Sequence, residues 1–147
     1  MKLAIGCDPN AAVMKEKLAS LCKDLGHEVE DFGSDDPIYA NTAIAVAETV
    51  ATGRADRGIL ICGTGIGMTI AANKVKGAYA ALLSDVYSAE RAMKSNNSNI
   101  ACLGAFTVGE KLGEELVKTW LGCEFTAGCP SQPKVNRYRE YDAKRGA

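Results

Sequence analysis

The chain has 147 residues, which suits one domain on the usual range of about 100–200 residues per domain. Hydrophobic residues make up 47% and charged residues 24%, values that favour a folded globular protein over a disordered one. The 17 basic and 18 acidic residues give a net charge of −1, so we expect neither nucleic acid nor an acidic membrane as a partner. The single histidine excludes any metal site or mechanism that needs two histidines.

The six cysteines include no C-x-x-C pair, the spacing typical of zinc ribbons and thioredoxin-like redox sites. The N-terminus lacks the longer apolar region of a signal peptide, and no apolar stretch approaches the ~20 residues of a membrane-spanning helix. We therefore expect a cytoplasmic protein with no metal site, whose cysteines are reduced thiols that mostly serve core packing.

The first part of the chain alternates short apolar runs with longer helical patterns. It predicts a strand over residues 2–6, a helix from about residue 10 to 25, a second strand over 27–32 and a second helix over 39–52. A glycine directly follows each predicted helix, which is typical of a helix end.

The middle of the chain continues this alternation. Residues 57–62 form a continuous apolar run, as in a strand buried on both faces, and a glycine-rich loop follows over 63–67. A third helix is then expected over 68–74, a fourth strand over 79–83 and a fourth helix over 85–94.

The last part predicts a fifth strand over 100–103, a fifth helix over 109–121 and a polar helix over 134–144. A strand–helix alternation repeated five times indicates an α/β fold with a parallel sheet between two layers of helices. The strand order does not follow from the sequence. We expect a single domain over 1–147, in which 130–147 form a C-terminal arm.

Ligands of parallel α/β sheets bind beyond the carboxyl ends of the strands. Polar residues follow three of the predicted strands there, at Asp8, at the 62–67 loop and at Ser84-Asp85. An asparagine-rich run at 95–99 instead precedes the fifth strand, so we expect it at the opposite edge of the sheet unless the chain loops back.

The loop after the third strand carries the strongest chemical signal. Its alternating glycines, Gly63, Gly65 and Gly67, let backbone N–H groups approach an anion. The spacing departs from the dinucleotide pattern G-x-G-x-x-G, and no Walker lysine is present, so the loop predicts a cradle for a phosphate or an enolate-like oxyanion. Cys62 precedes these glycines in a setting that favours a thiolate, which acts as a nucleophile or a general base. The alternative is a core thiol at the end of a strand.

Residues 58–75 (GILICGTGIGMTIAANKV) closely resemble the central motif of the ribose-5-phosphate isomerase B and galactose-6-phosphate isomerase family. Further resemblance at 4–8, 26–33, 84–89 and 96–104 extends it over nearly the whole chain. The resemblance implies a Rossmann-like α/β/α sandwich with a five-stranded parallel sheet, an aldose–ketose isomerase that needs no cofactor, and a homodimer with shared active sites. A tetramer remains an alternative to the dimer.

The resemblance also implies roles for individual residues. Cys62 is the base that moves a proton between C1 and C2 of the sugar phosphate through an enediolate, and Thr64 lies beside it as a second catalytic group. Backbone N–H groups of the glycine loop stabilise the oxyanion. The substrate-binding residues implied in this way are Asp8, Tyr39, Gly63, Gly65, Gly67 and Asn96.

The C-terminal arm departs from the family pattern. The phosphate-binding arginines usual in the family are altered, with Cys129 or Pro130 near one position and Lys134 near the other, followed by Arg137 one turn on. Lysine can still hold a phosphate as a point charge. We expect Lys134 and Arg137 to bind phosphate and the arm to reach a neighbouring subunit; the alternative is a solvated surface helix.

Two histidine positions of the family are also empty. Members that act on ribose 5-phosphate usually have a histidine where this chain has Pro9 and another where it has Ser95, and the second is credited with helping to open the furanose ring. Ribose 5-phosphate closes its ring through the C4 hydroxyl, whereas a tetrose 4-phosphate has that oxygen esterified and stays open. Residues 38–41, 87–92 and 95–97 also resemble the erythrulose-4-phosphate isomerase branch.

The sequence thus favours interconversion of erythrulose 4-phosphate and erythrose 4-phosphate. Three alternatives stay open. One is a ribose 5-phosphate/ribulose 5-phosphate isomerase of the pentose phosphate pathway. Another is a non-catalytic sugar-phosphate-binding subunit of a hetero-oligomeric isomerase, although the retained Cys62 and glycine loop argue against it. The third is a redox or nucleophilic cysteine enzyme.

Overall fold

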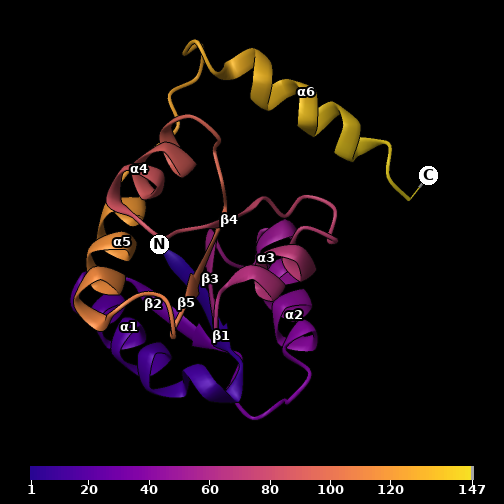
Figure 1. The fold of residues 1–147 in the computed structure, drawn as a ribbon. Helices are drawn as coiled ribbons and strands as arrows, with labels where there is room; N and C mark the ends of the chain where they lie inside the picture. Colours follow the sequence, from indigo (N-terminus) through magenta and orange to yellow (C-terminus); the bar gives the residue numbers. More distant parts are fainter. Residues whose placement is uncertain (147) are drawn as a thin grey trace.

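In the computed structural model, which describes residues 1–146, a parallel sheet lies between two layers of helices (Figure 1). The sheet has five strands in the order β2-β1-β3-β5-β4, so the predicted parallel α/β fold is confirmed. β3 is the central strand and lies between β1 and β5. The short strands β2 and β4 form the two edges. The strand bounds are β1 Lys2–Cys7, β2 Glu28–Asp31, β3 Arg57–Cys62, β4 Ala80–Leu82 and β5 Ile100–Gly104.

Five helices cover the two faces of the sheet. One face carries α1 (Ala12–Asp24), α4 (Val86–Lys94) and α5 (Glu110–Gly122), and the other carries α2 (Tyr39–Ala51) and α3 (Ile66–Ala72) (Figure 1). A short 3₁₀ turn, η1, spans Pro9–Ala11 between β1 and α1. The final helix, α6 (Gln132–Ala143), lies apart from both layers, across one end of the sheet.

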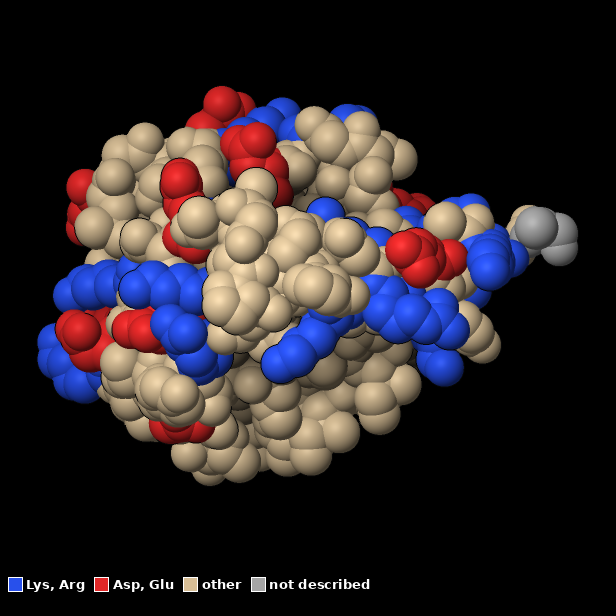
Figure 2. Space-filling view, turned by 90° about the horizontal axis from the view of Figure 1, so that it is seen from above, with Lys and Arg blue, Asp and Glu red and all other residues tan. Residues whose placement is uncertain are grey.

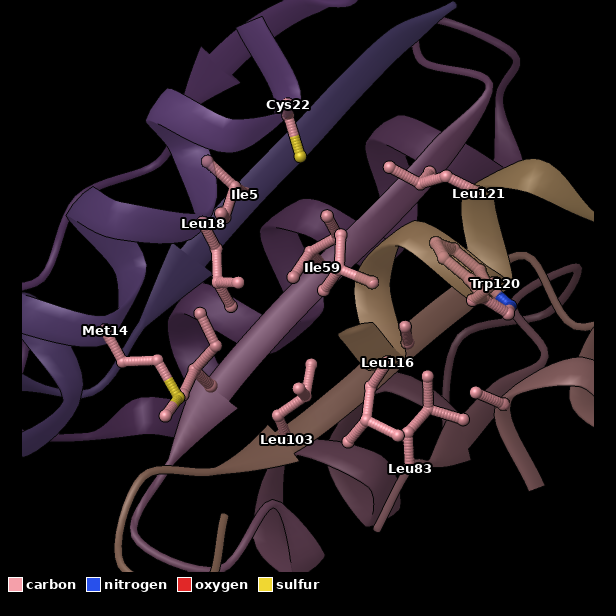
Figure 3. Close-up of a cluster of buried hydrophobic side chains, with 14 of the residues drawn as sticks. Ile5, Met14, Leu18, Cys22, Ile59, Leu83, Leu103, Leu116, Trp120 and Leu121 are labelled. Carbon is pink, nitrogen blue, oxygen red and sulfur yellow. The ribbon is translucent and has the colours of Figure 1, made fainter. Parts of the chain in front are cut away.

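The sheet separates two hydrophobic cores, and β3 contributes to both. Ile59 and Ile61 point to the side of α1, α4 and α5, whereas Leu60 and Cys62 point to the side of α2 and α3. This double burial explains the continuous apolar run in the sequence. Trp120 of α5 is fully buried in the first core (Figure 3), where its indole N–H donates to Ser98 Oγ at 2.9 Å.

The element boundaries follow the sequence closely, with one shift that matters for the site. α3 begins at Ile66, two residues before the predicted start at 68, and ends at Ala72. Gly65 precedes it with a φ of 78°, a left-handed conformation that glycine adopts without strain. The chain therefore turns into the helix inside the glycine loop rather than after it.

The arm helix α6 is held by a polar latch at Asp142. This carboxylate accepts hydrogen bonds from Gly77 N (2.8 Å), Tyr79 Oη (2.9 Å) and Arg145 Nε (2.7 Å). Because Gly77 and Tyr79 precede β4, the latch fixes the arm at the amino end of the sheet (Figure 1). The helix begins at Gln132, two residues earlier than predicted.

All six cysteines are free thiols, and four of them are buried. The prediction that the thiols mostly serve packing holds for Cys7, Cys22 and Cys102, whereas Cys123 and Cys129 are only half-buried. Over residues 1–146 we find no group of three or more His, Cys, Asp or Glu arranged to hold a metal ion. Across the same span, no helix combines the length and apolarity needed to cross a membrane.

Candidate active site

Cys62 lies at the last position of β3, at the carboxyl edge of the sheet, and is 5% exposed. Its Sγ accepts a hydrogen bond from the Gly65 amide at 3.1 Å, inside the loop that leads into α3. A hydrogen bond donated to sulfur stabilises the thiolate more than the thiol, because the negative charge strengthens the bond. The Gly65 amide therefore supplies a backbone donor directly to this sulfur.

The other fully buried thiols face a different environment. Burial raises the pKa of Cys7 and Cys22 to about 11 and that of Cys102 to about 12. These three side chains are therefore uncharged thiols near neutral pH and make poor bases. Cys62 differs from them in receiving an amide hydrogen bond on its sulfur at the carboxyl edge of the sheet.

The glycine loop is anchored by the segment that follows β5. Ala105 N donates to Cys62 O at 2.8 Å, and Phe106 N donates to Gly63 O at 2.9 Å. A Cβ on Gly104 would lie 2.6 Å from the carbonyl carbon of Thr64, so the two backbones meet where only glycine fits. These hydrogen bonds hold the loop at the carbonyl groups of Cys62 and Gly63.

The N–H groups of the loop divide into two sets. The Gly65 amide donates to Cys62 Sγ, and the Ile66 amide donates to Thr64 Oγ1 at 3.3 Å. The amides of Gly63 and Thr64 donate to no group in the part of the chain that the structure describes. The Gly67 amide likewise donates to no group among the described residues, so the amides available to an anion are those of Gly63, Thr64 and Gly67, while the Gly65 amide contacts the thiol.

Two aromatic rings border the glycine loop. A Cβ on Gly67 would lie 2.6 Å from Cε2 of Tyr39, which starts α2, and a Cβ on Gly63 would lie 2.9 Å from Cδ2 of Phe106. Tyr39 therefore borders the loop and covers Gly67. Phe106 is a neighbour that the sequence did not indicate, since a single phenylalanine in a loop follows no pattern. Both glycines leave room that these rings occupy.

Asp8 reaches the same edge from β1. Its amide donates to Ile61 O at 3.0 Å, which places it beside the end of β3, next to Cys62. Its Oδ1 accepts the Asn10 amide at 2.7 Å and caps η1. The structure thus brings Asp8 and the 62–67 loop together at one edge, as the chain pattern predicted, and places Tyr39 beside them.

The remaining predicted site residues lie at the opposite edge. Asn96 precedes β5, and the first residue of β5 pairs with Gly58, four positions before Cys62 along β3. At about 3.3 Å per residue, this separates the two edges by roughly 13 Å. The prediction of an asparagine run opposite the glycine loop is confirmed, and within one chain Asn96 does not join Cys62.

The arm residues belong with Asn96. Tyr138 of α6 donates its hydroxyl to the Asn96 carbonyl, and Lys134 and Arg137 are exposed on the same helix. Lys134 and Arg137 border a groove of about 660 Å³ with Tyr138 and Tyr141. Figure 2, seen from the α6 side, shows Lys and Arg side chains gathered beside the arm. One chain therefore presents two groups of candidate site residues at opposite ends of the sheet.

A cavity of about 400 Å³ opens beside the edge strand β4, between α4 and α6. It is lined by strand residues and by Arg91, Asn96, Ser98 and Tyr138. Arg91 was not among the predicted site residues, because a single arginine on a helix that also carries Glu90 and Lys94 looks like part of a solvated face.

The comparisons with known proteins agree with this architecture. The sequence model of the Ribose/Galactose Isomerase family matches residues 3–138. A protein of Listeria innocua named ribose-5-P isomerase B is 46% identical over 98% of this chain and 99% of its own length. A protein of Mycolicibacterium smegmatis named D-erythrulose-4-phosphate isomerase 2 is also 46% identical, over 97% of each chain.

Solved structures give the same result. Ribose-5-phosphate isomerase B of Clostridium thermocellum superposes with a TM-score of 0.92 at 40% identity, over 98% of this chain and 99% of that one. In both sequence and structure, this chain therefore matches proteins named ribose-5-phosphate isomerase B over nearly their full length. The chain belongs to the Ribose/Galactose Isomerase family and is a sugar-phosphate aldose–ketose isomerase.

Proposed function

We propose that this chain interconverts erythrulose 4-phosphate and erythrose 4-phosphate, with Cys62 as the base. The position of the single histidine carries the proposal. His27 precedes β2, where its Nδ1 lies 3.2 Å from the N-terminal amine. β2 and β4 are opposite edge strands, four strand spacings of about 4.8 Å apart, so His27 lies roughly 19 Å from the β4 side where Asn96 lies.

A substrate in a closed ring needs a proton donor at the ring oxygen before its carbonyl is available. Imidazole suits this step because its pKa lies near neutrality. Neither Pro9 nor Ser95 supplies a group that titrates near neutral pH. An enzyme without that acid is best matched to a sugar phosphate that is already open, and a tetrose 4-phosphate cannot form a furanose.

The chemistry then needs one base and one oxyanion site. The Cys62 thiolate takes the proton from the hydroxyl-bearing carbon next to the carbonyl, the hydroxyl proton passes between the two enediolate oxygens, and the Cys62 thiol then returns its proton to the former carbonyl carbon. The free amides of Gly63 and Thr64 face the developing enediolate oxygen, an interaction that is usually the largest single contribution to such catalysis. The Thr64 hydroxyl lies in the same loop, and the Asp8 Oδ2 oxygen remains open to a sugar hydroxyl.

We further propose that two copies of the chain share each site, so that Asn96, Lys134 and Arg137 of one copy complete the Cys62 edge of the other. The separation of the two groups within one chain supports this arrangement. Several large hydrophobic side chains exposed on the elements around β4 support it too, since exposed apolar side chains are a feature of interaction sites. They are Ile66 and Ile70 of α3, Leu82 of β4, and Val86 and Tyr87 of α4.

A steady-state comparison of C4, C5 and C6 sugar phosphates with the purified protein tests the substrate. We expect kcat/KM for erythrulose 4-phosphate to exceed that for ribose 5-phosphate at least tenfold. Equal or faster turnover of ribose 5-phosphate would reject the tetrose assignment and favour the pentose one, which the name of the Listeria relative keeps as the second candidate. Sedimentation of the same sample tests the shared site, since a monomer at assay concentration contradicts it.

A further inference from the structure

We propose that Arg91 is a further substrate-binding residue, which donates its Nε–H to an oxygen of the sugar phosphate in the cavity beside Asn96. The proposal rests on the proposed function, because it takes Asn96 to be a substrate contact. It concerns the cavity of about 400 Å³ at the β4 edge, which the Cys62 chemistry does not use within one chain.

The guanidinium of Arg91 is held in place on three sides. Its Nη2 donates to Glu90 Oε1 at 2.6 Å, its Nη1 donates to Ser95 Oγ at 3.3 Å, and its Cζ lies 6.0 Å from the centre of the Tyr87 ring. Such contacts fix the orientation of a side chain that would otherwise be mobile. The Arg91 head group is therefore preorganised at the wall of the cavity.

One donor of this head group has no partner. Among the buried side-chain nitrogen and oxygen atoms of residues 1–146, Arg91 Nε alone lacks a hydrogen bond. A buried N–H without an acceptor costs about 1–3 kcal/mol, so folded proteins almost always satisfy such groups. An acceptor oxygen delivered by a ligand in the adjacent cavity would satisfy it.

The surroundings point to a hydroxyl or carbonyl oxygen rather than to the phosphate. Glu90 already balances the charge of Arg91, which weakens its attraction for a dianion. The neighbouring polar groups are neutral: the Asn96 amide, and the Ser98 hydroxyl, which accepts from Trp120 and keeps its own proton to donate. Exposed basic side chains suited to phosphate lie farther along the arm, at Lys134 and Arg137.

The contact between Arg91 and Ser95 brings the guanidinium close to Asn96. Position 95 lies next to Asn96, so the guanidinium places a fixed positive donor at this point of the loop. Arginine stays protonated at all physiological pH values, so it can stabilise oxygen but cannot hand it a proton. Arg91 at this point therefore suits a substrate whose ring is already open, because it does not itself supply the proton that ring opening needs.

The test compares Arg91→Met and Arg91→Lys with the control Lys94→Met. Lys94 is on the same helix, lies 3.9 Å from the same Glu90 and does not line the cavity. We expect kcat/KM for the best sugar phosphate to fall at least tenfold in both Arg91 variants and to stay within twofold in Lys94→Met. The lysine variant should fail because it keeps the charge but loses the Nε donor. Calorimetry should show a matching loss of affinity for that sugar phosphate when Arg91→Lys is added to Cys62→Ala, compared with Cys62→Ala alone.

The outcomes separate the two proposals. If the wild type turns over tetrose phosphate and both Arg91 variants stay within twofold, the inference about Arg91 is wrong and the proposed function stands. Full activity of Arg91→Lys alone also overturns it, since charge then suffices. If the wild type prefers ribose 5-phosphate, the substrate assignment fails, and the same comparison on ribose 5-phosphate still decides whether Arg91 binds the sugar. Thermal melting and sedimentation of each variant identify a loss that comes from unfolding or dissociation.

Discussion

The amide nitrogen of Gly65 lies 3.1 Å from Sγ of Cys62, three residues earlier in the chain. Gly65 adopts a φ of 78°, which directs the chain that follows this amide into α3. Gly65 therefore has two roles: its N–H donates to the thiol, and its left-handed conformation starts the turn into α3. The predictions for Cys62 and Gly65 follow from it.

Cys62→Ala should abolish turnover and leave sugar-phosphate binding intact. General-base catalysis is worth about 100- to 10,000-fold, and the proposed mechanism gives this role to Cys62. Steady-state kinetics measure the loss, and calorimetry measures the retained affinity. Cys123→Ala is the control, because this thiol is half-buried and directly follows α5 at the amino edge. A Cys62→Ala variant with more than a tenth of the wild-type kcat contradicts the assigned role.

Gly65→Ala should destabilise the fold and inactivate the enzyme together. A left-handed conformation costs a residue with a Cβ about 1–2 kcal/mol, and here that Cβ would also lie 2.9 Å from the carbonyl carbon of Leu103. Gly26→Ala provides the matched control, because its φ is 88° and nothing lies within 4 Å of its Cβ. Urea unfolding should show the strain alone for Gly26→Ala, with activity kept, and a larger loss for Gly65→Ala. Equal losses in the two variants would mean that the contact at Leu103 is relieved by a small shift.

Asp142→Ala should release the arm and raise KM, with a smaller effect on kcat. Burial opposes ionisation of Asp142, but hydrogen bonds from Gly77, Tyr79 and Arg145 outweigh it and hold its pKa below the usual value. A lowered pKa means that the latch contributes fully above the ordinary carboxyl range, near pH 4, and is lost as the pH falls through the lower folded value.

Hydrogen exchange checks this prediction. Amides of residues 132–143 should exchange faster at pH 7 in Asp142→Ala, and the wild type should show the same change only in strong acid. Glu140→Gln serves as the control, because Glu140 is an exposed acid on the same helix. Unchanged protection of α6 in Asp142→Ala would show that the other contacts of the arm, among them the buried Val135 and the Tyr138 hydroxyl on Asn96, hold it without the latch.

Local signals explain which parts of the fold the sequence predicts. β3 was predicted at both ends because its two-sided burial leaves a run of apolar residues with a charged residue before it and a glycine loop after it. The predicted start of α3 was too late because Gly65 is typical of a loop in the sequence. In the structure, its left-handed conformation places the helix directly after it. Strand order depends on pairings between residues far apart in the chain, such as Cys62 with Gly104, and no local pattern carries that information.

The candidate site divides in the same way. The Cys62 edge could be predicted, since residues that end neighbouring parallel strands must meet. The partners of that edge could not, because Phe106 approaches Gly63 only through the loop that follows β5. Arg91 was missed for a related reason: only the fold shows that its Nε is buried and unpaired beside Asn96.

Ser95→His should shift the enzyme toward substrates that must open a ring. Ser95 directly precedes Asn96, and its Oγ lies 3.3 Å from Nη1 of Arg91. An imidazole at this position therefore lies close to the cavity that Arg91 and Asn96 line. With an ordinary pKa near 6.5, that imidazole can donate a proton that Arg91 cannot. We expect the ratio of kcat/KM for ribose 5-phosphate to that for erythrulose 4-phosphate to rise at least tenfold, and the ribose reaction to gain a new inflection near pH 6.5. Ser95→Ala controls for the lost hydroxyl and should leave the ratio unchanged. An unchanged ratio in Ser95→His, with sugar-phosphate binding retained, would show that the missing acid does not set the choice of substrate.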